Sequence, residues 1–226
     1  MKRGDGRKPE DIRPMEITAG VLQKANGSAM VKMGRTIAVA GVFGPRQMFP
    51  RRLQQFSRAV LQCRYIMTPF STDERARPGP SRRSKELSMV INKALSAAVF
   101  LEEFPKAAIG VYIDVIQADA GTRTAAINAA SVALADAGIP MRDLVAAVAV
   151  GKIDGKYVVD LAGPEEELSD CDLPVAVMPR DGRVTLLQMD GDLPPEDVKQ
   201  LLKIAKEGCA KIYEMEKEAL RKRWMK

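Results

Sequence analysis

Hydrophobic and polar residues alternate along four segments in the first third of the chain. The segments are residues 15–22, 28–33, 36–43 and 60–67. A period of two predicts strands whose side chains point in turn to the two faces of a sheet. Asn26-Gly27 and Gly34 supply turns between the first three strands, and Gly44-Pro45 is expected to end the third. The first third is therefore expected to form sheet strands linked by turns.

Apolar residues recur at helical spacing in three later segments. They are residues 82–105, the alanine-rich run 125–137 and the long amphipathic run 194–224. Strand-like segments between and after these helices are residues 109–117, 145–153, 156–161, 174–178 and 184–189. The dipeptide Asp154-Gly155 predicts a hairpin turn. This order of strands and helices predicts an α+β chain with two similar halves.

The chain has 226 residues, of which 46% are hydrophobic, so it can bury a sizeable core. Its length fits one large domain or two small fused ones, and we expect a single domain over residues 1–226. No apolar run approaches the ~18 residues that cross a bilayer. The first seven residues also lack the apolar stretch of a secretory signal. These features predict a cytoplasmic protein that does not enter the membrane.

Cysteine and histidine usage limits the chemistry that the chain can perform. Three cysteines stand far apart and histidine is absent from the sequence. An odd number of cysteines without metal-binding spacing argues against a disulfide framework and against a zinc–cysteine site. A histidine general base is excluded. Catalysis must therefore rest on carboxylates, arginines, hydroxyls or a metal ion held by oxygen ligands.

The formal net charge is +6, and the positive charge is distributed unevenly. Arginines crowd into one part of the chain: Arg46, Arg51, Arg52, Arg58, Arg64, Arg75, Arg77, Arg82 and Arg83. The planar arginine fork can bind phosphate oxygens at two points, which favours recognition of a polyanion over a contribution to solubility alone.

The stretch from Ala118 to Thr124 joins an apolar strand to the alanine-rich helix. Gly121 permits a tight turn, and Thr122 is expected to cap the helix. The first free N–H groups of the helix would then lie beside the guanidinium of Arg123, which predicts a phosphate-binding turn. The same pattern also fits a capped helix that carries one surface arginine.

Two further groups of residues are candidates for a site. Residues 163–172 form an expected acidic loop before a buried strand, and a carboxylate there could hold a metal ion or transfer a proton, unless the loop is merely solvated. Arg82 and Arg83 begin a helix, where the helix dipole disfavours positive charge, so either an anionic ligand or a nearby carboxylate is expected. Arg64 shares a strand face with aliphatic residues and reaches either a groove or solvent.

Several motifs in order along the chain resemble the ribonuclease PH superfamily. They are Asp5-Gly6-Arg7, Gly27-Ser28-Ala29, Gly44-Pro45-Arg46, Arg77-Pro78-Gly79-Pro80-Ser81-Arg82-Arg83-Ser84, Gln117 to Thr124, Ala135 to Ile139 and Asp170 to Pro174. The resemblance implies that superfamily's fold, with mixed or antiparallel sheets, packed helices, two similar βα halves and a long C-terminal helix. It also implies a 3′-to-5′ exoribonuclease in which inorganic phosphate is the co-substrate.

The resemblance assigns roles to individual residues. Gly121, Thr122 and Arg123 correspond to the turn that binds the attacking phosphate. Asp172 corresponds to the catalytic aspartate, which would act either as a general acid for the leaving oxygen or as the ligand of a Mg²⁺ ion. Glu166 is our choice for the second catalytic carboxylate among the acidic residues upstream of Asp172.

The resemblance further implies that Arg82 and Arg83, with Arg64 less directly, contact single-stranded RNA. The run from Arg77 to Ser84 and the later run Leu187 to Gly191 are most similar to the catalytic ring subunits of archaeal exosomes. The expected partners are then a homologous non-catalytic subunit, in a hexameric ring of three heterodimers, and RNA-binding cap subunits.

Two other functions stay open within the superfamily. One is a homohexameric ribonuclease PH that trims transfer RNA, and the other is a non-catalytic ring subunit that binds RNA. The run from Arg77 to Ser84 argues against the first. The joint presence of Thr122, Arg123 and Asp172 argues against the second.

Overall fold

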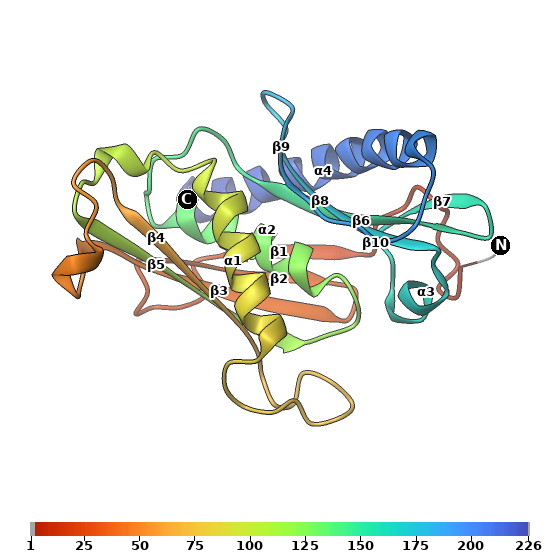
Figure 1. Cartoon of the computed structure of the whole chain (residues 1–226), viewed down its shortest axis with the longest axis horizontal. Coiled ribbons are helices and arrows are strands. Elements are labelled where there is room, and N and C mark those ends of the chain that lie inside the picture. Colours follow the sequence, from red (N-terminus) through yellow and green to blue (C-terminus); the bar gives the residue numbers. More distant parts are fainter. Residues whose placement is uncertain (1–2, 226) are drawn as a thin grey trace.

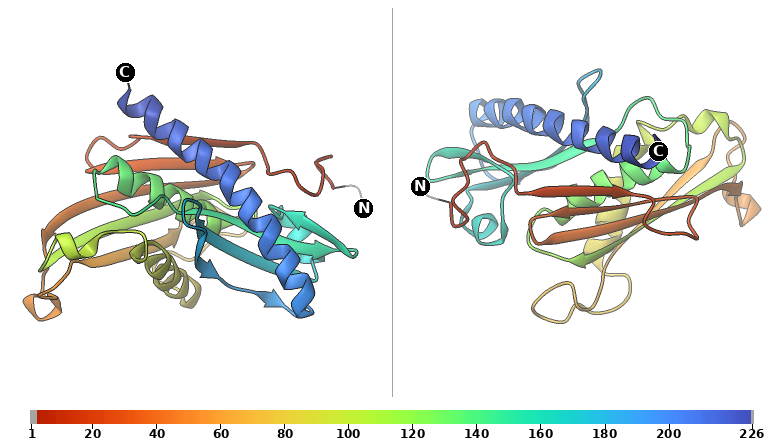
Figure 2. Two further views of the ribbon diagram at one scale, coloured as in Figure 1. Left: turned by 90° about the horizontal axis from the view of Figure 1, so that it is seen from above. Right: turned by 180° about the vertical axis from the view of Figure 1, so that it is seen from behind.

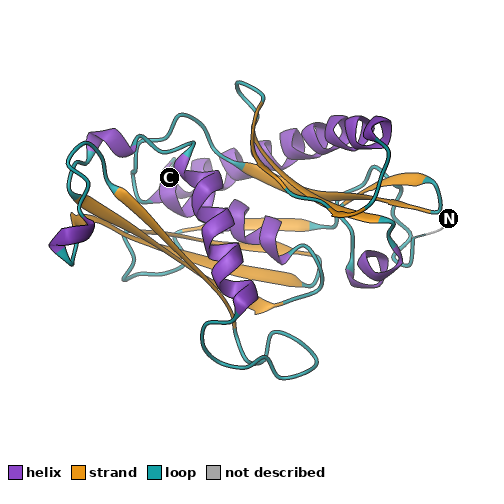
Figure 3. Ribbon diagram, in the orientation of Figure 1, coloured by secondary structure: helices purple, strands orange, loops and turns teal. Residues whose placement is uncertain are grey.

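The computed structural model describes residues 3–225, so Met1, Lys2 and Lys226 of the expected domain lie outside the described residues. These residues form two β-sheets and four α-helices, as the α+β prediction requires (Figures 1 and 3). The strands of the first sheet are β1 (Met15–Ala19), β2 (Gly27–Met33), β3 (Thr36–Gln47), β4 (Val60–Met67) and β5 (Ala107–Gln117). Their order is β1-β2-β3-β5-β4, and only β4 and β5 run parallel.

The second sheet is antiparallel and carries Asp172 and Asp190. Its strands are β6 (Ala146–Ile153), β7 (Lys156–Val159), β8 (Cys171–Met178), β9 (Arg183–Leu187) and β10 (Asp190–Gly191). The path is β10-β8-β6-β7, and β9 also pairs with β8. Asp154 and Gly155 both adopt positive φ between β6 and β7, which confirms the predicted hairpin turn.

Helix α2 (Thr122–Asp136) lies between the two sheets and contacts β2, β3, β6 and β8. It is buried almost all round because most of its side chains are small, which lets both sheets approach closely. Gly27 on β2 shows how close this approach is, since a Cβ atom there would lie 2.1 Å from the backbone nitrogen of Ala137. Any side chain at Gly27 would therefore push α2 away from the first sheet.

Two further long helices pack against the sheets, one beside α2 and the other across the second sheet. Helix α1 (Arg82–Ser96) packs on β4 and α2, and it buries Leu87, Ile91 and Leu95. Helix α4 (Pro195–Trp224) crosses β6, β7 and β8 and reaches β1, as the two views of Figure 2 show. The short helix α3 (Gly163–Leu168) and the 3-10 turns Arg51–Leu53 and Leu101–Glu103 complete the helical segments. None of the helices within residues 3–225 is long and apolar enough to cross a membrane.

Four predicted boundaries were wrong. Strand β3 continues through Gly44-Pro45 to Gln47, because an irregularity between Phe43 and Arg46 lets its pairing with β5 resume. Helix α1 ends at Ser96, well before Pro105, and a 3-10 turn fills part of the gap. The expected acidic loop contains α3, and β8 begins at Cys171, before residue 174. Asp172 therefore lies in a strand of the second sheet.

Candidate active site

The turn that leads into α2 has the geometry of an anion seat. Ala120 and Gly121 adopt positive φ angles of 56° and 65°, and Gly121 is the N-cap residue. Within residues 3–225, no side chain caps the start of α2 by a hydrogen bond. These groups carry the positive end of the helix dipole, so they can bind an anion.

The prediction that Thr122 caps α2 was wrong. Because the cap position falls on Gly121, Thr122 is already the first helical residue, and its hydroxyl oxygen accepts a hydrogen bond from the Tyr65 hydroxyl at 3.0 Å. The hydroxyl of Thr124 donates to the Gly121 carbonyl at 2.9 Å and so stabilises the turn. The phosphate-binding prediction therefore rests on the backbone of the turn and on Arg123.

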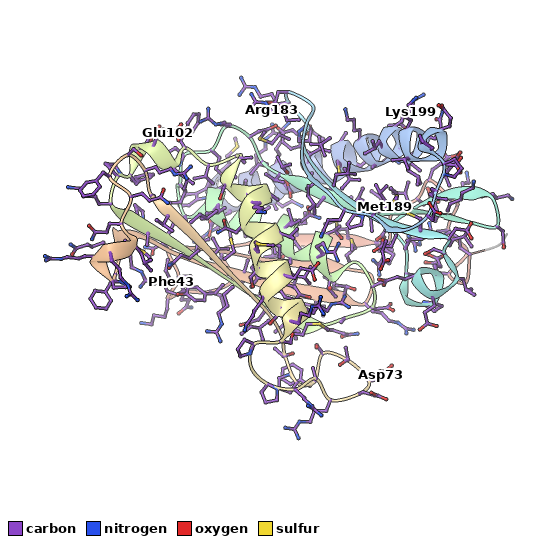
Figure 4. All side chains as sticks on the ribbon, in the orientation of Figure 1. Phe43, Asp73, Glu102, Arg183, Met189 and Lys199 are labelled. Atoms are coloured by element: carbon purple, nitrogen blue, oxygen red, sulfur yellow. The ribbon has the colours of Figure 1, made fainter. Side chains whose placement is uncertain are left out.

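A cavity of about 260 Å³ lies beside this turn and brings most of the predicted site together. The predicted residues that line it are Gly121, Thr122, Arg123, Arg83, Glu166 and Asp172. They come from α1, α2, α3 and β8, so both halves of the fold contribute. Thr72, from the long loop between β4 and α1, completes one wall. That loop protrudes below α1 in Figure 1, and Asp73, labelled in Figure 4, lies on it.

Asp172 is partly buried and lies opposite Gly151 of β6 and Asp190 of β10. Burial raises the pKa of Asp172 to about 6, with further increases from Glu166 and Asp190 that outweigh the opposite effect of Arg123. A carboxyl group with this pKa exists in both protonation states near neutral pH. It can therefore donate a proton or, when ionised, bind a cation.

Helix α3 explains which acidic residue reaches the cavity. Glu165 turns inward, where its carboxylate accepts from the Ala162 N–H at 2.9 Å and receives two hydrogen bonds of 2.7 Å from Arg3. Glu166, the next residue, is exposed and lines the cavity. The placement agrees with the choice of Glu166 over its neighbours, although the catalytic role of Glu166 stays a prediction.

The three predicted RNA-binding arginines are not equivalent. Ser81 and Ser84 form a reciprocal capping box at the start of α1, which places Arg83 on the cavity. Arg82 is exposed outside it, and Arg64 lines a neighbouring cavity of about 420 Å³ with Ser84 and other residues. Within residues 3–225, neither Arg82 nor Arg83 forms an ion pair, and the first turn of α1 has no acidic residue. A nearby carboxylate therefore does not explain these two arginines.

Three functional candidates escaped sequence reasoning. Tyr65 binds Thr122, Gln188 accepts a hydrogen bond of 2.7 Å from Arg123, and Asp190 stands opposite Asp172. Alternation along β4 puts Tyr65 on the strand face opposite Arg64, but it does not reveal the partner of Tyr65. Gln188 and Asp190 belong to the run Leu187 to Gly191, but that run gave them no individual role, because they reach the site only through the pairing of β8 with β9 and β10.

The residues at the cavity fit a hard divalent cation. Glu166 and Asp172 both line it, and Glu166 raises the pKa of Asp172. A Mg²⁺ ion bound between them would relieve this repulsion, and Mg²⁺ usually takes one or two carboxylates and keeps several waters. No group of three or more potential metal ligands occurs among the residues that the structure describes. The fit is therefore to a partly hydrated ion and not to an all-protein metal cage.

Comparison with known proteins identifies the family. Residues 11–140 match the model of the 3′ exoribonuclease family, domain 1, and residues 143–208 match its domain 2. The chain is 53% identical over 222 residues to the exosome complex component Rrp41 of Methanopyrus kandleri. The aligned region covers 98% of this chain and 93% of that protein.

Two solved structures resemble the fold closely. The crystal structure of Rrp46 from rice (Oryza sativa) has a TM-score of 0.87 and 25% identity and covers 97% of this chain and 100% of that one. A chain of the Archaeoglobus fulgidus exosome with RNA bound to the active site has a TM-score of 0.81 and 28% identity, over 94% of this chain and 92% of that one. With two family models that together span most of its length, the chain belongs to the 3′ exoribonuclease family of the ribonuclease PH type.

Proposed function

We propose that this exoribonuclease is the catalytic subunit of an exosome ring and that it degrades RNA by phosphorolysis. In this reaction, inorganic phosphate attacks the last phosphodiester of single-stranded RNA and releases a nucleoside diphosphate. One observation carries the proposal: a helix N-terminus with Arg123 and a pair of carboxylates, Glu166 and Asp172, face the same small cavity. Such a cavity can hold an anionic nucleophile at one end and assist a leaving oxygen at the other.

The amides at the start of α2 and the guanidinium of Arg123 would bind the attacking phosphate. Arg83 would bind the RNA phosphate that is under attack. One phosphate oxygen then forms a bond to the phosphorus atom as the bond to the 3′ oxygen breaks. Protonated Asp172 would give its proton to that departing oxygen, and its raised pKa keeps part of the population protonated near neutral pH.

Glu166 and Asp172 would hold Mg²⁺, which would supply positive charge to stabilise the oxygen that develops negative charge. The two roles of Asp172 predict opposite pH dependence. A proton donor loses activity as pH rises through about 6, whereas a metal ligand gains activity over the same range. The pH–rate profile at saturating Mg²⁺ therefore decides between them.

The proposed assembly is a hexameric ring of three heterodimers with a homologous non-catalytic subunit, to which RNA-binding cap subunits attach. The similarity to an exosome component in Methanopyrus kandleri and to a chain of the Archaeoglobus fulgidus exosome supports this assembly. A homohexamer is the alternative. The mass in solution of the chain, alone and mixed with the homologous subunit, separates the two.

The test of the reaction is to incubate the assembled protein with 3′-labelled RNA, with and without phosphate, and to identify the released nucleotide. We expect nucleoside diphosphate that appears only with phosphate. Arg123→Ala should weaken the dependence on phosphate more than RNA binding, because it removes a charge-assisted contact to the nucleophile. Arg221→Ala, at an exposed position on α4, is the matched control. Release of nucleoside monophosphate, or an unchanged phosphate dependence in Arg123→Ala, would contradict the proposal.

A further inference from the structure

Gln188 lies on the short connector between β9 and β10, next to Met189, which Figure 4 labels. The connector is tied to β8 because the Gln188 N–H donates to the Pro174 carbonyl at 3.3 Å. The Gln188 side chain is partly buried, and its Oε1 accepts a hydrogen bond of 2.7 Å from Nη1 of Arg123. A residue 65 positions away in sequence thus holds the arginine of the anion seat.

The guanidinium of Arg123 makes few other polar contacts within residues 3–225. Its hydrogen bond to Gln188 is the only one that it forms within residues 3–225, and its buried Nε has no partner there. It also forms no ion pair among these residues. Since the one acceptor that orients Arg123 is neutral, the full positive charge stays available to a ligand in the cavity.

Arg13 shows what happens when an arginine is held by a carboxylate and not by an amide. Asp160 binds the Arg13 side chain through two hydrogen bonds, of 2.9 and 2.8 Å, and Arg13 is 4% exposed. A bidentate pair of this kind is strong, and the carboxylate neutralises the charge of the arginine. A carboxylate at position 188 would compete directly with phosphate for Arg123, which an amide does not.

We propose that Gln188 is a positioning residue that orients Arg123 toward the cavity without neutralising it, and that it thereby sets the affinity of the seat for phosphate. This inference rests on the proposed function, in which Arg123 binds the attacking phosphate. It predicts an order of phosphate affinity in which wild type exceeds Gln188→Ala, and Gln188→Ala exceeds Gln188→Glu. A residue that only supported the fold would not give this order, because glutamate keeps the size and most contacts of glutamine.

The experiment compares both variants with Gln200→Glu, which makes the same chemical change at an exposed position on α4. The assembled protein is assayed at saturating RNA over a range of inorganic phosphate. We expect the KM for phosphate to rise about tenfold in Gln188→Ala and roughly 10²-fold in Gln188→Glu, since positioning is lost in the first and a competing charge is added in the second. kcat at saturating phosphate should change by less than about threefold, because the seat is intact once filled. Gln200→Glu should match wild type.

A second measurement does not depend on catalysis. Inorganic phosphate should raise the melting temperature of wild type, since a ligand that binds only the folded state stabilises it. This increase should shrink in Gln188→Ala and disappear in Gln188→Glu, while RNA affinity measured without phosphate stays within about twofold. Equal phosphate KM in Gln188→Glu and wild type, or equal loss of RNA and phosphate binding, would overturn the role of Gln188. Failure of wild type itself to use phosphate would instead overturn the proposed function.

Discussion

Two clusters of arginines and carboxylates differ in whether their charges pair with each other. The closed cluster consists of Arg3, Arg13, Asp160 and Glu165, and the open cluster consists of Arg83, Arg123, Glu166 and Asp172. In the closed cluster, each guanidinium forms a bidentate pair with a buried carboxylate. In the open cluster, the four residues share a cavity, and none of them appears in an ion pair within residues 3–225.

The pKa values of Glu165 and Asp172 record this difference. Burial acts to raise the pKa of Glu165, but the hydrogen bonds from Arg3 and the Ala162 amide, together with the charges of Arg3 and Arg7, outweigh burial and lower the pKa below its usual value. Burial also raises the pKa of Asp172, and there the effect is reinforced by Glu166 and only partly offset by Arg123 and Arg83. Glu165 has direct hydrogen bonds from arginine and Asp172 has none within residues 3–225, so the arginines of the open cluster keep their charges for a ligand.

The closed cluster supports the open one. Arg13 reaches beyond Asp160 and donates to the Asp119 carbonyl, in the stretch that leads to the anion seat. Arg3 fixes Glu165 on α3, and this arrangement leaves Glu166 facing the cavity. The amino-terminal segment thus connects β7, α3 and the turn before α2.

The largest effect is expected when the closed cluster is broken. Asp160→Asn should lower the free energy of unfolding by about 3 kcal/mol or more, because it leaves the buried charge of Arg13 uncompensated. Asparagine is the suitable replacement because residue 160 has a φ of 56°, which asparagine tolerates. Denaturant unfolding measures the loss. A loss below about 1 kcal/mol would contradict this prediction, because it would mean that the Arg13–Asp160 pair contributes no more than an exposed salt bridge.

The matched change in the open cluster is Asp172→Asn, which should act on catalysis. We expect turnover to fall about 10²-fold or more, with RNA affinity unchanged or slightly higher because a like charge is removed. Between pH 3.8 and about 6 the folded state binds more protons at Asp172 than the unfolded state, so ionised Asp172 reduces stability at neutral pH. Thermal unfolding at pH 7 should therefore occur at an equal or higher temperature in the variant. Lower thermal stability, or near-normal turnover, would contradict the assignment.

Asp190→Asn should sharpen the contrast with a smaller effect. Asp190 lies opposite Asp172 and raises its pKa, so the substitution should move to lower pH whichever limb of the pH–rate profile Asp172 sets. If protonated Asp172 is the active form, the rate at pH 7 falls by less than about tenfold. If ionised Asp172 binds Mg²⁺, the rate at pH 5.5 rises instead. A profile identical to wild type would show that Asp190 does not act on Asp172.

The smallest effect separates two neighbouring arginines. Arg83→Ala should reduce the salt dependence of RNA binding by roughly 0.7 in the slope of log K against log salt, since one phosphate contact is lost at the cavity. Arg82→Ala should change the slope less, because Arg82 lies outside the cavity. Fluorescence anisotropy at several salt concentrations measures both slopes. Equal slopes for the two variants would show that RNA contacts both arginines alike.

The comparison also explains why some site residues could be predicted from sequence and others could not. Gly121 and Arg123 belong to one continuous turn, so the local pattern of strand, glycine and helix made them candidates, and the family motif then assigned their role. Glu166 could not be separated from Glu165 by composition, since both are acidic and adjacent. Only the pairing of Glu165 with Arg3, which lies 162 residues away, shows that Glu165 has a structural partner and that Glu166 is the residue left facing the cavity.

The sequence by itself determined nine of the ten strands within residues 3–225, the three long helices, the hairpin at Asp154-Gly155 and the motifs of the family, because these depend on residues close together in the chain. The tertiary structure alone decided which charges are paired and which stay open. Gln188, Asp190 and Arg13 acquire their roles from partners between 18 and 147 residues away, through one strand pairing and two side-chain hydrogen bonds that no local pattern encodes. Ion pairing and pKa depend on distances in space, and those distances exist only once both halves of the chain have packed around α2.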